Sequence, residues 1–112
     1  MWFECECGTI IKDSTDYLVN KAHLIPDQDW FDVYDAIDEQ VVEPVAQGEV
    51  DPQRAMMDAR EIIRKPSRLM WQCYSCGRLY LQSYDRSDIH CFVPSDPEQS
   101  MQILRGRRSE PK

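Results

Sequence analysis

The 112-residue sequence contains no apolar run approaching the ~18 residues that a membrane-spanning helix requires. Its first residues, Met1-Trp2-Phe3-Glu4-Cys5, lack the basic region and the long apolar stretch of a secretory signal peptide. We therefore expect a cytoplasmic protein with no membrane segment. Thiols stay reduced in that compartment, so the five cysteines are expected to bind a metal rather than to form disulfides.

Motifs of enzymatic catalysis are also missing. The sequence has no Gly-rich phosphate loop and no His-Glu-x-x-His, and its histidines are His23 and His90. The many carboxylates gather on one stripe that we expect to face solvent, without a partner base. We therefore predict that the protein is not an enzyme.

Positive charge is scarce in the first half of the chain. Residues 1–53 hold 13 acids and 2 bases, whereas residues 54–112 hold 7 acids and 11 bases. No Lys or Arg lies between Lys21 and Arg54, where nine acids occur. Attraction to phosphate requires a positive field, so this balance disfavours nucleic acid and anionic lipid as partners. It permits a basic protein partner.

Two cysteine-containing segments have the same pattern. Each reads as an apolar strand, a tight turn closed by Gly, and a second apolar strand; they are residues 2–11 and 70–81. Two thiolates on one turn can point at a common ion, and the following Gly permits the positive φ that such a turn needs. Two such turns supply four thiolates, which matches the tetrahedral coordination of Zn²⁺.

The paired Cys-Gly turns resemble a zinc ribbon. The resemblance implies that the ligands of a structural Zn²⁺ are Cys5, Cys7, Cys73 and Cys76. The first turn is Cys-x-Cys rather than Cys-x-x-Cys, and 65 residues separate Cys7 from Cys73, more than in most ribbons. His23 or His90 are therefore kept as substitutes for Cys5. Four thiolates leave no position open for water, which indicates a structural rather than a catalytic metal. The same turns also resemble rubredoxin, where iron replaces zinc.

The long segment between the cysteine turns is predicted to form two helices. The first opens at Pro26-Asp27, carries the apolar positions Trp30, Tyr34, Ile37 and Val41, and is expected to stop by about Val42. Its opposite face holds a stripe of like charges spaced three or four apart, which is either merely solvated or a docking surface for the basic partner. This acidic stripe consists of Asp32, Asp35, Glu39 and Glu43.

The second helix has clear end signals. Asp51 is a good N-cap, Pro52 suits the first helical position, and Pro66 lies just beyond the last turn. Its buried stripe is expected to consist of Ala55, Met56, Ala59, Ile62 and Ile63, with Met57 also serving as core filler.

The residues after the second cysteine turn carry the alternative function. Strand alternation places Arg78, Tyr80, Gln82, Tyr84 and Arg86 on one face, and alternating Arg and Tyr can bind single-stranded nucleic acid. A short strand is then expected at residues 90–93, with Cys91 as a buried apolar residue. Capping-box spacing at Ser95 predicts a short helix ending near Leu104.

Together these features predict an α+β fold. It comprises an antiparallel zinc-ribbon sheet, a two-helix insertion at about residues 22–66 and a short C-terminal helix, in a single domain of residues 1–105. Residues 106–112 are expected to be a disordered basic tail. The predicted function is a non-catalytic, structural-zinc module that binds a protein.

In size and acidity the chain is similar, at the level of class only, to bacterial immunity proteins that neutralise a basic, nuclease-type toxin. The alternatives are a nucleic-acid-binding or transcription-associated zinc ribbon and, less favoured, a rubredoxin-like electron carrier.

Overall fold

The computed structural model describes residues 1–109 and divides into two compact units. The β unit comprises Met1–Leu24 and the chain from Arg68 onward, and the helical unit comprises Ile25–Ser67. The predicted α+β class is confirmed. None of the helices within residues 1–109 is both long enough and apolar enough to cross a membrane.

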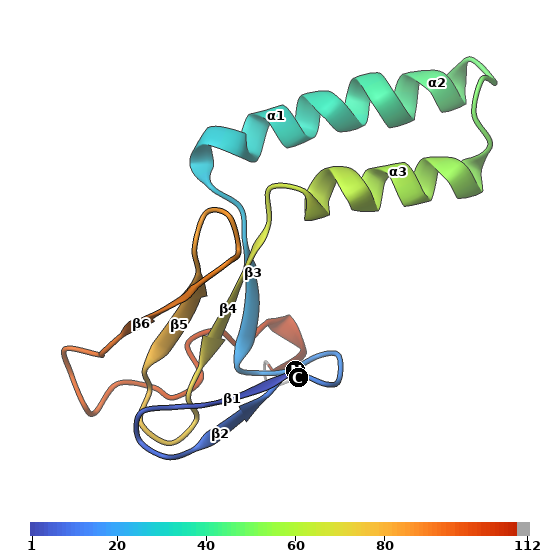
Figure 1. The fold of residues 1–112 in the computed structure, drawn as a ribbon. Helices are drawn as coiled ribbons and strands as arrows, with labels where there is room; N and C mark the ends of the chain where they lie inside the picture. The colour runs from blue at the N-terminus through green and yellow to red at the C-terminus, as the bar shows by residue number, and fades with distance from the viewer. Residues whose placement is uncertain (110–112) are drawn as a thin grey trace. The chain divides into compact units, whose positions relative to one another are not determined.

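The β unit contains two antiparallel sheets (Figure 1). A two-stranded sheet pairs β1 (Trp2–Glu4) with β2 (Ile10–Lys12), so that Phe3 lies opposite Ile11. A four-stranded sheet has the order β3-β4-β5-β6. Its strands are β3 (Lys21–Leu24), β4 (Arg68–Gln72), β5 (Leu79–Gln82) and β6 (Ile89–Phe92). Each cysteine turn thus connects two paired strands, as predicted.

The core of the β unit lies where the two sheets meet. Trp71 and Ile11 are fully buried and Tyr80 is 6% exposed, and these residues pack in one cluster with Cys5 and Cys73. Phe3 places its ring edge-on against Trp71, at 5.5 Å between centroids, and against Tyr80, at 5.0 Å. This apolar core is small, and two of its five buried members are cysteines.

The helical unit is a pair of antiparallel helices (Figure 1). The first runs through α1 (Asp27–Ile37), the π-helical segment η1 (Asp38–Val42) and α2 (Glu43–Ala46). The second is α3 (Pro52–Arg64), where Arg54 N donates 3.0 Å to the Asp51 carboxylate. The predicted start of this helix, with an Asp51 cap and Pro52 in the first turn, is confirmed.

The predicted end of the first helix near Val42 is wrong. The helix continues to Ala46 because η1 inserts a wider turn, in which Glu43 N donates to Asp38 O. Residues Val33, Ile37, Val41 and Val45 recur every fourth position, which drifts round a regular α-helix of 3.6 residues per turn. A π turn has more residues per turn, so it keeps residues spaced four apart closer to one face of the helix. The wider turn also tolerates the ring and the missing N–H of Pro44.

The expected buried stripes are also partly wrong. Val33 of α1 and Ala55 of α3 are buried, and Ile37, Val41, Ala59 and Ile62 are half-buried. By contrast, Trp30 is 41% exposed, Tyr34 47%, Met56 54% and Ile63 45%, and Met57 is exposed as well. The contact lines of the two helices therefore run through small and β-branched residues, because these permit close approach, and the large side chains lie beside them.

The predicted C-terminal helix at residues 95–104 is wrong. This segment forms turns, and Arg107–Ser109 forms a single 3-10 turn (η2). The Asp96 carboxylate accepts from Glu98 N at 2.9 Å, and Ser100 Oγ accepts from Gln102 N at 3.0 Å. Hydrogen bonds of this kind, from a side chain to the backbone N–H two residues later, compete with helix formation. Of the predicted disordered tail, residues 110–112 lie outside the described part of the chain.

Candidate metal centre

Both cysteine turns close with a glycine at positive φ. In the first turn, Gly8 N donates to Cys5 O and Gly8 has φ +94°. In the second, Gly77 N donates to Cys73 O and Gly77 has φ +80°. Residues other than Gly are strained in this conformation. The predicted role of the glycines, to supply the positive φ of each cysteine turn, is therefore confirmed.

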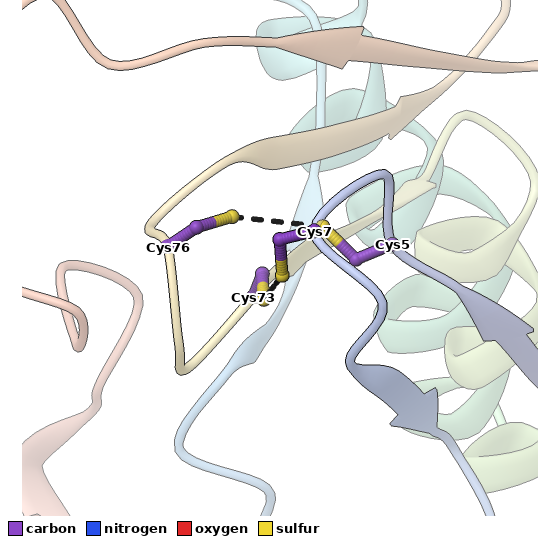
Figure 2. Close-up of side chains that lie close together, drawn as sticks. All are labelled: Cys5, Cys7, Cys73 and Cys76. Carbon is purple, nitrogen blue, oxygen red and sulfur yellow. Dashed lines mark hydrogen bonds between the residues drawn. The ribbon is translucent and has the colours of Figure 1, made fainter.

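The two turns bring four sulfur atoms together. The ligand atoms of Cys5, Cys7, Cys73 and Cys76 all lie within 4.8 Å of one another. Figure 2 marks two of the pairs, Cys5–Cys76 and Cys7–Cys73, each with an Sγ–Sγ distance of 3.6 Å. Zn–S bonds of about 2.3 Å in a tetrahedron place the sulfurs about 3.8 Å apart. The four cysteines therefore fit a tetrahedral metal ion.

Three of the four sulfurs accept a hydrogen bond from a neighbouring group. The hydroxyl of Tyr80 donates to Cys5 Sγ at 3.1 Å, and Arg78 Nη1 donates to Cys76 Sγ at 3.1 Å. Ser75 N donates to Cys73 Sγ at 3.4 Å, whereas Cys7 Sγ itself donates to Thr9 Oγ1 at 3.2 Å. Cys5, Cys73 and Cys76 thus each have a nearby polar hydrogen, an environment that favours the thiolate, the form that binds metal.

The pKa values of the thiols differ across the cluster. Contact with the Thr9 side chain lowers the pKa of Cys7 to about 6. Burial acts to raise the pKa of Cys76, but hydrogen bonds from the backbone and guanidinium of Arg78 outweigh it and lower that pKa. Burial raises the pKa of Cys5 to about 11. A bound cation would offset that burial penalty, because a coordinated thiol is deprotonated outright.

The histidines kept as substitutes lie elsewhere. His23 is an exposed residue of β3 and His90 an exposed residue of β6, and the cluster within residues 1–109 contains neither. Cys5 itself belongs to the cluster, and Cys91, half-buried on β6, does not. The acidic stripe Asp32, Asp35, Glu39 and Glu43 is exposed on the first helix, and its docking role stays a prediction.

Sequence reasoning missed the residues that contact the sulfurs. It assigned Arg78 and Tyr80 to a nucleic-acid-binding face, whereas both bond to cysteines. Tyr84 and Arg86 lie in the turn after β5 rather than on a continued strand. The available signal was proximity: Arg78 directly follows the Gly that closes the second cysteine turn, and Tyr80 is on the same strand face.

The fold and the site define a small α+β protein with a four-cysteine cluster that could hold a metal ion. The chain belongs to the family described as "Domain of unknown function (DUF8617)", whose model matches residues 1–96. That match includes both cysteine turns and the whole helical unit. No curated protein and no solved structure matches the chain.

Proposed function

We propose that Cys5, Cys7, Cys73 and Cys76 bind one Zn²⁺ as a structural centre, and that the protein is a non-catalytic module that binds another protein. The observation that carries the metal assignment is the approach of four sulfurs from two distant turns to within 4.8 Å. Zinc favours tetrahedral thiolate ligands, and four of them leave no site for substrate or water. When bound, the ion would link the two turns.

The surroundings of the cluster support a thiolate-rich site. Four thiolates around Zn²⁺ carry a net charge of −2, and the Arg78 guanidinium at 3.1 Å from Cys76 partly balances it. Arg78 Nε also lies 3.8 Å from a Glu6 carboxylate oxygen, which ties the second turn to the first. Hydrogen bonds and charges at this distance orient metal ligands and adjust their affinity.

A structural metal would also compensate for the small core of the β unit. Among the described residues of this unit, only a few apolar side chains are fully buried, and Cys5 and Cys73 are among them. Small domains with limited cores commonly gain stability from a metal, and binding to a site absent from the unfolded chain contributes directly to folding.

Cobalt substitution tests the site directly. Purified protein, stripped of metal and given Co²⁺, is expected to show the visible d–d bands and thiolate-to-cobalt absorption of a tetrahedral four-sulfur site. Cys76→Ser should reduce the thiolate absorption, whereas Cys91→Ser, a matched change outside the cluster, should leave it unchanged. A spectrum of octahedral cobalt, or equal loss in both variants, would contradict a four-cysteine site.

The proposed partner is a basic protein, and the support for it is electrostatic. The first helix of the helical unit carries seven acids and no base, and the acidic stripe is exposed along it. Complementary charge of this kind speeds association with a cationic surface. The most specific form of the proposal is an immunity protein that neutralises a basic, nuclease-type toxin; it rests on the chain's size and acidity.

Neutralising the stripe separates docking from simple solvation. Changing Asp32, Asp35, Glu39 and Glu43 to Asn or Gln should leave the melting temperature unchanged or slightly raised, because like-charge repulsion is relieved. Binding to a cognate basic partner should weaken, more at low salt than at high salt. Unchanged binding would place the interface elsewhere.

A further inference from the structure

The helical unit exposes half of its large apolar side chains. Of its 43 residues, Val33 and Ala55 are the buried apolar ones. At this length the unit is close to the limit of about 40 residues below which a chain seldom builds a sufficient core without a metal, a disulfide or association. Seven large apolar side chains of the unit are exposed: Trp30, Phe31, Tyr34, Val42, Met56, Met57 and Ile63.

Four of these side chains share one side of the helix pair. Each residue of an α-helix is turned by ~100° from the one before it. On this basis Trp30 and Tyr34 lie about 60–100° around the axis of α1 from the buried Val33. Met56 and Ile63 lie about 80–100° around the axis of α3 from the buried Ala55. The rotation has the same sense in both helices. The two helices are antiparallel (Figure 1). In such a pair, equal rotation from the contact line leads to the same side. We call Trp30, Tyr34, Met56 and Ile63 the apolar face; the rings of Trp30 and Tyr34 are 5.2 Å apart on it.

Opposite charges border the apolar face. Asp38 lies on its outer edge on the first helix and Arg60 lies on its outer edge on α3, and both are exposed. The two residues lie at the same height along the helix pair. Asp38 is eight positions before Ala46, where the first helix ends, and Arg60 is eight positions after Pro52, where α3 begins. One border is therefore acidic and the other basic.

We propose that a second copy of this chain covers the apolar face, so that two helix pairs form a four-helix bundle. A twofold axis parallel to the helices stacks the first helix of one copy on α3 of the other. That arrangement buries both apolar faces and sets Asp38 against Arg60 of the second copy, twice per dimer. A uniformly cationic partner helix would meet repulsion at Arg60, so self-association satisfies both borders better.

The test is the oligomeric state of the full, metal-loaded chain by analytical ultracentrifugation. At a protein concentration of tens of micromolar, the measured mass of the wild type is expected to be twice the 13.2 kDa of one chain. Asp38→Lys and Arg60→Glu should each weaken the dimer about tenfold, because two ion pairs become like-charge contacts. The double variant, which restores opposite charges at the border, should recover most of the dimer.

The control is Glu39→Lys, which makes the same charge change one residue further on. Glu39 is exposed and lies on the side away from the apolar face, so the dimer should persist. A monomeric wild type at 100 µM would overturn the proposal. So would equal weakening by Asp38→Lys and Glu39→Lys, or a double variant no better than the single ones. Since the charge variants keep the helix contact lines intact, each result can be read in folded protein.

Discussion

The hydroxyl of Tyr80 donates a hydrogen bond to Cys5 Sγ across 3.1 Å, which joins β5 to the first cysteine turn. The same oxygen accepts from Glu6 N at 3.2 Å, and the ring packs against Phe3. One side chain therefore belongs to the apolar core and to the surroundings of the sulfur cluster. This link would make the affinity of the proposed metal site depend on β5.

We predict that Tyr80→Phe weakens metal binding about 10–100-fold, the usual effect of removing a hydrogen bond to a metal ligand. The ring and its packing are kept, so the fold should persist. Competition with a chelator for Zn²⁺ measures the change. Tyr84→Phe is the matched control, because Tyr84 is 88% exposed in a turn. Equal affinities in the two variants would show that the Tyr80 hydroxyl does not support the site.

The second prediction concerns Asp13, which anchors the buried Trp71. Its carboxylate accepts from Trp71 Nε1 at 3.1 Å and from Lys21 Nζ at 2.9 Å. Burial acts to raise the pKa of Asp13, but the bonds from Lys21 and Trp71 outweigh it and lower that pKa below its ordinary value. The lowered pKa stabilises the folded state above the unfolded pKa of about 3.9, and that stabilisation disappears as the pH falls through the folded value.

Asp13→Asn should therefore cost about 1–3 kcal/mol of unfolding free energy near neutral pH, as expected for hydrogen bonds to a charged group. The difference from the wild type should shrink below about pH 4. Denaturant unfolding of both proteins at each pH measures this difference in unfolding free energy. Any loss of metal in acid affects both proteins alike and therefore cancels from the difference. A difference that grows as the pH falls would have the wrong sign for this account.

The third prediction concerns Gln72, a fully buried polar residue of β4. Its Oε1 accepts from Ile103 N at 3.0 Å and its Nε2 donates to Ser100 O at 3.1 Å. Gln72→Leu should leave both backbone groups without this partner and lower the unfolding free energy by about 1–3 kcal/mol. Hydrogen exchange at the Ile103 amide should accelerate. Gln102→Leu, at an exposed neighbour, is expected to change neither quantity.

The fourth prediction concerns nucleic acid. Tyr80 is 6% exposed and Arg78 bonds to Cys76, so neither is available to stack on bases. We expect no binding of single-stranded oligonucleotides at physiological salt. Fluorescence anisotropy with and without Tyr84→Ala checks this, since an exposed stacking residue contributes about 1–3 kcal/mol per base. Micromolar affinity that falls steeply with salt would restore the nucleic-acid function.

Local patterns predicted the parts of the fold that local chemistry determines. The spacing of Cys73, Cys76 and Gly77 predicted the turn and its positive φ, because only the residues of that turn decide its geometry. The Asp51-Pro52 pair likewise predicted the start of α3, since capping involves the adjacent backbone alone.

Features that depend on distant residues could not be predicted in this way. The turns at residues 95–104 replace a helix partly because Gln72, about thirty residues earlier, bonds to Ser100 and Ile103. The role of Tyr80 depends on its pairing opposite Trp71, which brings its hydroxyl to Cys5. Local spacing carries neither fact.

The zinc content of the purified chain tests the central claim most directly. Elemental analysis should find one zinc per chain in a colourless wild type, no zinc in Cys73→Ser, and loss of the folded β unit in that variant. Bound iron with intense visible absorption would replace zinc by a rubredoxin-like centre. A metal-free wild type as stable as the metal-loaded protein would contradict a structural metal altogether.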